Sequence, residues 1–141
     1  MQGWPSLPEM DESGQEQRPR RPWLEKFRDA FRGLKFGIRG HSSFFIHFFC
    51  AALVIACAIV LKCELEQWCI LLLCIGFVLV TELINSAIET LHRGLDPQAR
   101  ERTWKALDIA AGAVLLASIT AAIVGAIIFV ERIVHNLTAP A

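Results

Sequence analysis

The sequence predicts an all-α membrane protein with one amphipathic interfacial helix and three transmembrane helices. The chain has 141 residues, of which 54% are hydrophobic, and this share is high for a soluble domain of this length. A membrane-spanning helix needs about 20 apolar residues. Three apolar runs have about this length, at residues 44–61, 68–91 and 106–130. The formal net charge is zero, which gives no argument for a nucleic-acid partner.

The distribution of basic residues predicts how these runs are oriented. Eight lysine and arginine residues precede the first run, and four lie between the second and third runs. Lys62 and Arg132 are the single basic residues of the two other segments. Basic residues are enriched in loops on the cytoplasmic side. We therefore expect a multi-pass protein with a cytoplasmic amino terminus, and with residues 131–141 as a short external tail.

Two segments precede the first run. Residues 1–22 contain four prolines and mixed charges, which is typical of a disordered tail. Residues 23–39 place apolar side chains on one face and basic side chains on the other; the apolar ones are Leu24, Phe27, Phe31, Leu34 and Ile38. This pattern predicts a helix lying in the membrane interface. A helix packed on a soluble partner is the alternative.

The second run contains polar residues at membrane depth. Glu82, Asn85 and Glu89 share one helical face within about 60°, since each residue turns the helix by about 100°. A carboxylate inside a membrane is costly and marks a functional site more often than a packing contact. We expect this face to point into a subunit interface. The alternative is a structural polar contact that only holds helices together.

The third run is rich in small residues, with Ala113, Ala117, Ala121 and Gly125 at intervals of four. Such stripes let helices approach closely in lipid. Because three single helices form a thin unit, we expect neighbouring subunits to enclose the polar face, which implies an oligomer.

The cysteines and histidines give weaker signals. Cys63 and Cys69 flank the external loop, and whether they form a disulfide stays open. His47 lies inside the first run near its cytoplasmic end, and we interpret it as a packing residue rather than a ligand.

The sequence contains neither a phosphate-binding G-x-x-x-x-G-K-[ST] loop nor a protein-kinase signature. Asp108 opens the third run, about level with Glu89 if the two helices are antiparallel. Opposed carboxylates beside a basic loop suit a Mg²⁺-bound polyphosphate, because Mg²⁺ prefers a few carboxylates together with phosphate oxygens. The deeper Glu82 is placed to take a proton from a lipid hydroxyl.

These residues resemble the motifs of the small bacterial integral-membrane diacylglycerol kinases and undecaprenol kinases. The octet Glu-Leu-Ile-Asn-Ser-Ala-Ile-Glu at 82–89 is similar to their second-helix signature, and Asp-Ile-Ala-Ala-Gly-Ala-Val-Leu-Leu at 108–116 is similar to their third-helix motif. Phe31-Arg-Gly-Leu and Phe44-x-x-His47 fit the amino-terminal part of the pattern. The resemblance covers about residues 23–130. It implies a homotrimer in the bacterial inner membrane, with ATP as donor, Mg²⁺ as metal and a lipid alcohol as acceptor.

The resemblance also assigns roles to single residues. Glu82 becomes the catalytic general base, Glu89 a metal ligand, and Asn85 and Asp108 polar residues of the nucleotide site. The second metal position falls on His41, where the family usually has an acidic residue, and imidazole is a poor Mg²⁺ ligand.

Two further departures alter the phosphate site. Leu107 stands where the family usually has a lysine, and Arg93 stands where it usually has an aspartate. Because Arg93 follows Glu89 by one helical turn on the same face, we predict that it replaces the missing cation as a phosphate-binding residue. The alternative is that Arg93 only anchors the helix at the cytoplasmic interface.

Three functions remain open. The first is an ATP-dependent lipid kinase acting on diacylglycerol or undecaprenol. The second is a catalytically inactive family member that serves as a membrane interaction protein. The third is an unrelated small transporter or proton-relay subunit, but the outer halves of the runs lack the charged residues that it needs. Residues 110–114 look closer to the undecaprenol type, although five residues do not decide the acceptor.

Overall fold

The computed structural model of the chain describes residues 22–39 and 43–138. These residues form four helices, namely α1 (Trp23–Arg39), α2 (Ser43–Val60), α3 (Leu65–Arg93) and α4 (Pro97–Thr138). Three of them, α2 to α4, are long and apolar enough to cross a membrane. The predicted all-α class is therefore confirmed, with three helices that have the length and composition of membrane spans. His41 and residues 1–21 of the predicted tail lie outside the described residues.

The chain divides into two units after Gly33, within α1. In the first unit, the guanidinium of Arg32 donates a hydrogen bond to Asp29 Oδ1 at 2.7 Å. The ammonium of Lys26 lies 4.9 Å from the ring centroid of Trp23. The apolar side chains of α1 are exposed, among them Leu24, Phe27 and Phe31. The helix thus has the amphipathic character that the sequence predicted.

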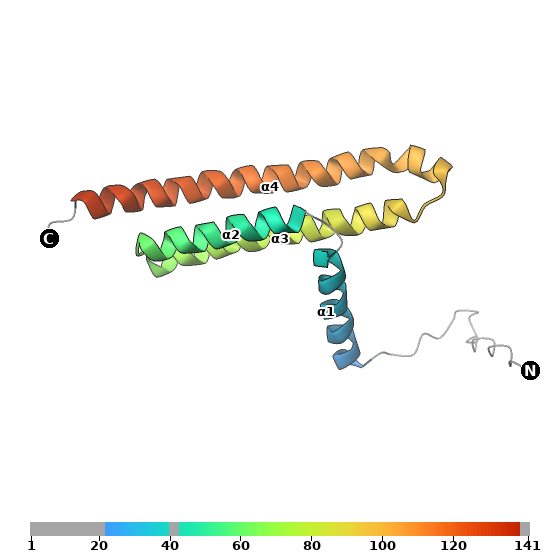
Figure 1. Cartoon of the computed structure of the whole chain (residues 1–141), viewed down its shortest axis with the longest axis horizontal. Coiled ribbons are helices and arrows are strands. Elements are labelled where there is room, and N and C mark those ends of the chain that lie inside the picture. Colours follow the sequence, from blue (N-terminus) through green and yellow to red (C-terminus); the bar gives the residue numbers. More distant parts are fainter. Residues whose placement is uncertain (1–21, 40–42, 139–141) are drawn as a thin grey trace, which may run out of the picture. The chain divides into compact units, whose positions relative to one another are not determined.

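In the second unit, α3 packs against both α2 and α4 (Figure 1). Both neighbours run antiparallel to α3, and its most extensive contact is with α4. The buried and half-buried positions of α2 recur mostly at three and four residues, at Phe44, His47, Ala51, Val54, Cys57 and Ala58. This spacing gives α2 one face toward the other helices.

An apolar core forms at the end of the bundle nearest the α2–α3 turn. Ala58, Leu71 and Ile128 are buried there, one from each of the three helices. Gly125 adds to the close contact, since a Cβ at this position would lie 4.0 Å from Leu71 Cδ2. The small-residue stripe of α4 therefore packs partly within the chain, at Ala117 and Gly125, both of which are buried.

The turn between α2 and α3 contains one residue with a left-handed backbone conformation. Lys62 has φ 52°, and the N–H of Cys63 donates to the carbonyl of Ala58 at 3.0 Å, which is the pattern of a Schellman cap. Arg132 of α4 then holds the turn in place. Its guanidinium donates to the carbonyls of Leu61 at 3.2 Å and Lys62 at 2.6 Å, and to Glu64 Oε1 at 2.8 Å.

The α3–α4 turn sets the register of the two longest helices. Asp96 Oδ1 accepts hydrogen bonds from the N–H groups of Gln98 and Ala99, each at 3.0 Å, and so caps α4. Beyond the turn, His92 Nδ1 lies 3.0 Å from Thr103 Oγ1. The helices extend past the apolar runs, because α4 begins at Pro97 and continues to Thr138.

Candidate active site

The polar residues of α3 are buried by the chain itself. Glu82 is 2% exposed, Asn85 8% and Ser86 1%, whereas Val80 and Ile84 on other faces of the same helix are exposed. The shared face predicted from the sequence is thus the inward face of α3. We expected neighbouring subunits to be needed to enclose it. For Glu82, Asn85 and Ser86 this was wrong, because α2 and α4 of the same chain pack around α3 and exclude solvent.

Glu82 meets a side chain that the sequence did not connect with it. His47 Nε2 of α2 lies 3.7 Å from Glu82 Oε2, and the two side chains are 18% and 3% exposed. Phe44, one turn earlier on the same face of α2, is almost fully buried. The antiparallel pairing of α2 and α3 therefore brings the histidine beside the deepest carboxylate.

A ladder of side chains leads from the buried face toward the end of α3. The Asn85 amide Nδ2 donates to Glu89 Oε1 at 3.0 Å, and the Arg93 guanidinium donates to Glu89 Oε2 at 3.2 Å. Each residue follows the previous one by four positions, so each lies one turn further along the same face. Exposure rises along this ladder, from 8% for Asn85 to 31% and 65% for the side chains of Glu89 and Arg93.

Two polar atoms on the buried face have no hydrogen-bond partner among the described residues. They are Asn85 Oδ1 and Ser86 Oγ. A buried polar atom without a partner costs about 1–3 kcal/mol. The Asn85 oxygen is an acceptor and the Ser86 hydroxyl both donates and accepts. The face thus offers two unused polar atoms to a bound hydroxyl, water or phosphate.

Asp108 is level with Glu89 but points elsewhere. The contact between His92 and Thr103 fixes the antiparallel register, which sets Asp108 opposite the turn of α3 that holds Glu89. Asp108 is nevertheless exposed, whereas Ala110 is buried. The two positions differ by about 200° around α4, because each residue turns the helix by about 100°. A single chain therefore does not bring Asp108 and Glu89 together.

A metal site is not completed by the described part of the chain. Within residues 22–39 and 43–138, no three histidine, cysteine, aspartate or glutamate side chains lie close enough together to hold a metal ion. The second predicted ligand, His41, lies outside these ranges. Glu89 stays a suitable single ligand, since Mg²⁺ is commonly held by one or two carboxylates with phosphate and water oxygens.

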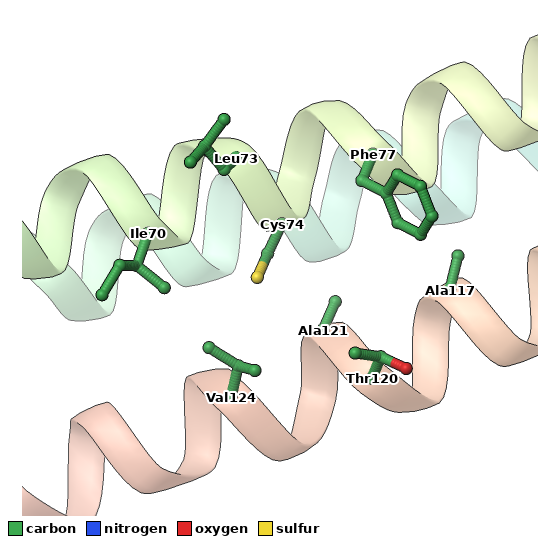
Figure 2. A pocket seen from close by; sticks show the side chains of 8 residues that line it. All are labelled: Ile70, Leu73, Cys74, Phe77, Ala117, Thr120, Ala121 and Val124. Atoms are coloured by element: carbon green, nitrogen blue, oxygen red, sulfur yellow. The ribbon is translucent and has the colours of Figure 1, made fainter.

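An apolar groove of about 360 Å³ lies between α3 and α4 (Figure 2). Its walls are Ile70, Leu73, Cys74 and Phe77 from α3, and Ala117, Thr120, Ala121 and Val124 from α4. The Thr120 hydroxyl is already bonded to the Leu116 carbonyl at 2.9 Å. The groove therefore offers mainly hydrocarbon contact, together with the free thiol of Cys74.

Comparison with known sequences identifies the class of protein. The sequence model of prokaryotic diacylglycerol kinase matches residues 28–129, so the chain belongs to this family. The assignment made from the motifs at 82–89 and 108–116 is therefore confirmed, and the family is one of lipid kinases.

Two relatives define the similarity further. A diacylglycerol kinase of Synechocystis sp. is 38% identical over 103 residues, which make up 72% of this chain and 59% of that protein. The match thus spans less than two thirds of the Synechocystis protein. An undecaprenol kinase of Bacillus subtilis is 29% identical over 111 residues, or 79% of this chain and 90% of that protein. No solved structure matches the chain significantly.

Proposed function

We propose that this chain is an ATP-dependent lipid kinase that transfers the γ-phosphate to the hydroxyl of diacylglycerol or undecaprenol. The observation that supports it best is the arrangement along α3. A carboxylate buried to 2% exposure stands one turn from a ladder of polar side chains that becomes steadily more exposed. A lipid hydroxyl and a water-soluble nucleotide need such an arrangement, with one end in the bilayer and the other at its surface.

Glu82 is the general base of this proposal. Its carboxylate takes the proton of the lipid hydroxyl while the lipid oxygen forms a bond to the γ-phosphorus. The bond between that phosphorus and the bridging oxygen of ADP breaks, and ADP leaves with the electron pair. Asn85 Oδ1 and Ser86 Oγ are buried on the same helix and have no hydrogen-bond partner within residues 22–39 and 43–138. They are suited to hold the hydroxyl or a transferring phosphate oxygen.

Arg93 and Asn85 flank Glu89 at the phosphate end. Arg93 is 65% exposed and presents a planar set of donors suited to phosphate oxygens. The Glu89 carboxylate accepts hydrogen bonds from Asn85 Nδ2 and Arg93, and a carboxylate can bind a metal as well as accept hydrogen bonds. A Mg²⁺ ion held here would supply neutralisation of the charge on the transferring phosphate. Glu89 would hold this ion, with His41 as the second position that the family pattern supplies.

The proposal includes a homotrimer. Asp108 is exposed on the face of α4 directed away from Glu89 of its own chain. This supports an arrangement in which Asp108 contributes to the nucleotide site of a neighbouring subunit. Many large apolar side chains of α2 to α4 are also exposed in the single chain, and they suit either lipid or neighbouring helices.

The proposed location is the bacterial inner membrane. The amino terminus and the α3–α4 turn face the cytoplasm, because twelve of the fourteen basic residues precede the first span or lie between the second and third. This orientation places Arg93 and Glu89 on the side where ATP is present. The carboxyl terminus then lies outside, together with the turn that Arg132 holds.

Phosphate transfer from labelled ATP tests this function. Purified protein in detergent micelles is given diacylglycerol and undecaprenol side by side, with Mg²⁺, and the labelled lipid is counted after extraction. Glu82→Gln is the matched control, since it keeps the size of the side chain and removes its charge. Label that depends on Glu82 in either lipid supports the proposal and also identifies the acceptor.

A catalytically inactive interaction protein is the second candidate. Two observations favour it. The two carboxylate oxygens of Glu89 already accept hydrogen bonds from Asn85 and Arg93, and Leu107 stands where the family usually has a lysine. If neither lipid is labelled while the protein still binds ATP or assembles, this candidate replaces the kinase.

A further inference from the structure

A close contact between His47 and Glu82 joins α2 to the proposed catalytic face of α3. The imidazole Nε2 lies 3.7 Å from the carboxylate Oε2, and both side chains are largely shielded from solvent. Their positions are 35 residues apart in the sequence, so the pair exists only because the two helices pack together. It is a cross-helix contact to the residue proposed as the general base.

The segments of α2 and α4 that pack beside this pair carry few other titratable groups. From α4, the stretch between Asp108 and Glu131 contains no titratable side chain. From α2, the remaining titratable groups are the thiols of Cys50 and Cys57. On α3, Glu89 lies two turns from Glu82 and is paired with Asn85 and Arg93. Shielding from water strengthens an interaction between such isolated polar groups.

We propose that His47 is a positioning residue for Glu82. The Nε2–H of His47 holds carboxylate oxygen Oε2, so that Oε1 is directed to the lipid hydroxyl and receives its proton. The 3.7 Å separation shortens to a hydrogen bond when substrate binds, as is common for catalytic contacts. This inference rests on the proposed kinase function. His47 keeps its own proton throughout and touches neither the lipid nor ATP.

A carboxylate that can rotate loses part of its effect as a base. A hydrogen bond to a charged group is worth about 10- to 100-fold in an equilibrium or a rate. Because His47 acts on the orientation of Glu82 and not on binding, its removal lowers kcat by about this factor. The KM values for ATP and lipid stay within about twofold.

Three variants separate positioning from packing. His47→Phe fills the space without a donor, His47→Gln keeps an amide donor near the place of Nε2, and His135→Gln makes the same exchange at an exposed histidine near the carboxyl terminus. We expect a loss of kcat in His47→Phe, recovery to within a few-fold of wild type in His47→Gln, and no change in His135→Gln. If His47→Phe and His47→Gln lose kcat equally, or if neither loses it, the positioning role is refuted.

A second measurement does not depend on turnover. In protein with ¹⁵N-labelled histidine, the ring nitrogen signals of His47, assigned by their loss in His47→Gln, are compared between wild type and Glu82→Gln. We expect the His47 signal to move and the His135 signal to stay. An unmoved His47 signal in a protein that phosphorylates lipid refutes this inference alone. Absence of lipid phosphorylation by the wild-type protein refutes the kinase function, and with it the role assigned to His47.

Discussion

Replacing Arg93 with alanine separates a phosphate-binding residue from an interfacial anchor. The Arg93 side chain is 65% exposed, and its hydrogen bond to Glu89 Oε2 is 3.2 Å long. Exposed ion pairs between residues four apart contribute about 0.3–0.5 kcal/mol. The substitution should therefore change the free energy of unfolding by less than about 1 kcal/mol, so a functional effect does not come from a damaged fold.

The effect on ATP should be much larger. A hydrogen bond from a charged group to phosphate contributes about 1.5–3 kcal/mol. This energy corresponds to an increase of about 10- to 100-fold in the KM for ATP. Arg93→Lys should give a smaller increase, because lysine keeps the charge and loses the planar pair of donors. The KM for the lipid should stay unchanged in both variants.

Initial rates over a range of ATP concentrations, at saturating lipid, measure this effect. Arg102→Ala is the matched control, since Arg102 is a basic residue at the same end of the bundle and is exposed on α4. If Arg93→Ala leaves both the KM for ATP and the maximal rate at the values of Arg102→Ala, then Arg93 is only an interfacial anchor. The proposal that the Arg93 end of the ladder binds the phosphates of ATP would then be wrong.

The remaining predictions concern packing and the polar face. Arg132→Gln removes charged donors from the α2–α3 turn, and we expect a loss of about 2–3 kcal/mol in unfolding experiments in detergent; an unchanged midpoint would show that the turn is held otherwise. Ser86→Ala removes a buried hydroxyl that has no partner among the described residues, so stability should stay equal or rise by up to about 1 kcal/mol, and a larger loss would reveal a hydrogen bond to Ser86. Gly125→Ala should be tolerated, because its Cβ would meet Leu71 at 4.0 Å, whereas Gly125→Leu should destabilise the α3–α4 contact by about 1–3 kcal/mol; equal melting temperatures for the two variants would contradict this.

The number and order of the spans could be predicted because hydropathy alone determines them. The ends of the helices could not be read from hydropathy, since a helix ends where its backbone hydrogen bonds end. In the structure Asp96 caps α4 and Pro97 is its first residue, well before the apolar run at 106. The apolar pattern alone therefore missed this boundary.

The candidate site was predictable where it depends on one helix. Glu82, Asn85 and Glu89 share a face because of helical geometry, and the structure brings Asn85, Glu89 and Arg93 into one ladder. Contacts between helices were not predictable in the same way. The partnership of His47 with Glu82 needs the register of α2 against α3, and the direction of Asp108 needs the rotation of α4.

The most direct test of the account is the phosphorylation of lipid by Glu82→Gln, measured together with assembly. Glutamine preserves the shape of the side chain on the buried face and cannot accept a proton as a base. A positioned general base contributes about 10²–10⁴-fold to a rate. We predict that the variant assembles as the wild type does and loses at least about 100-fold in kcat. Two results would show that Glu82 only holds the helices together. One is an unchanged kcat. The other is a smaller fraction of assembled protein in which the protein that still assembles keeps the wild-type kcat.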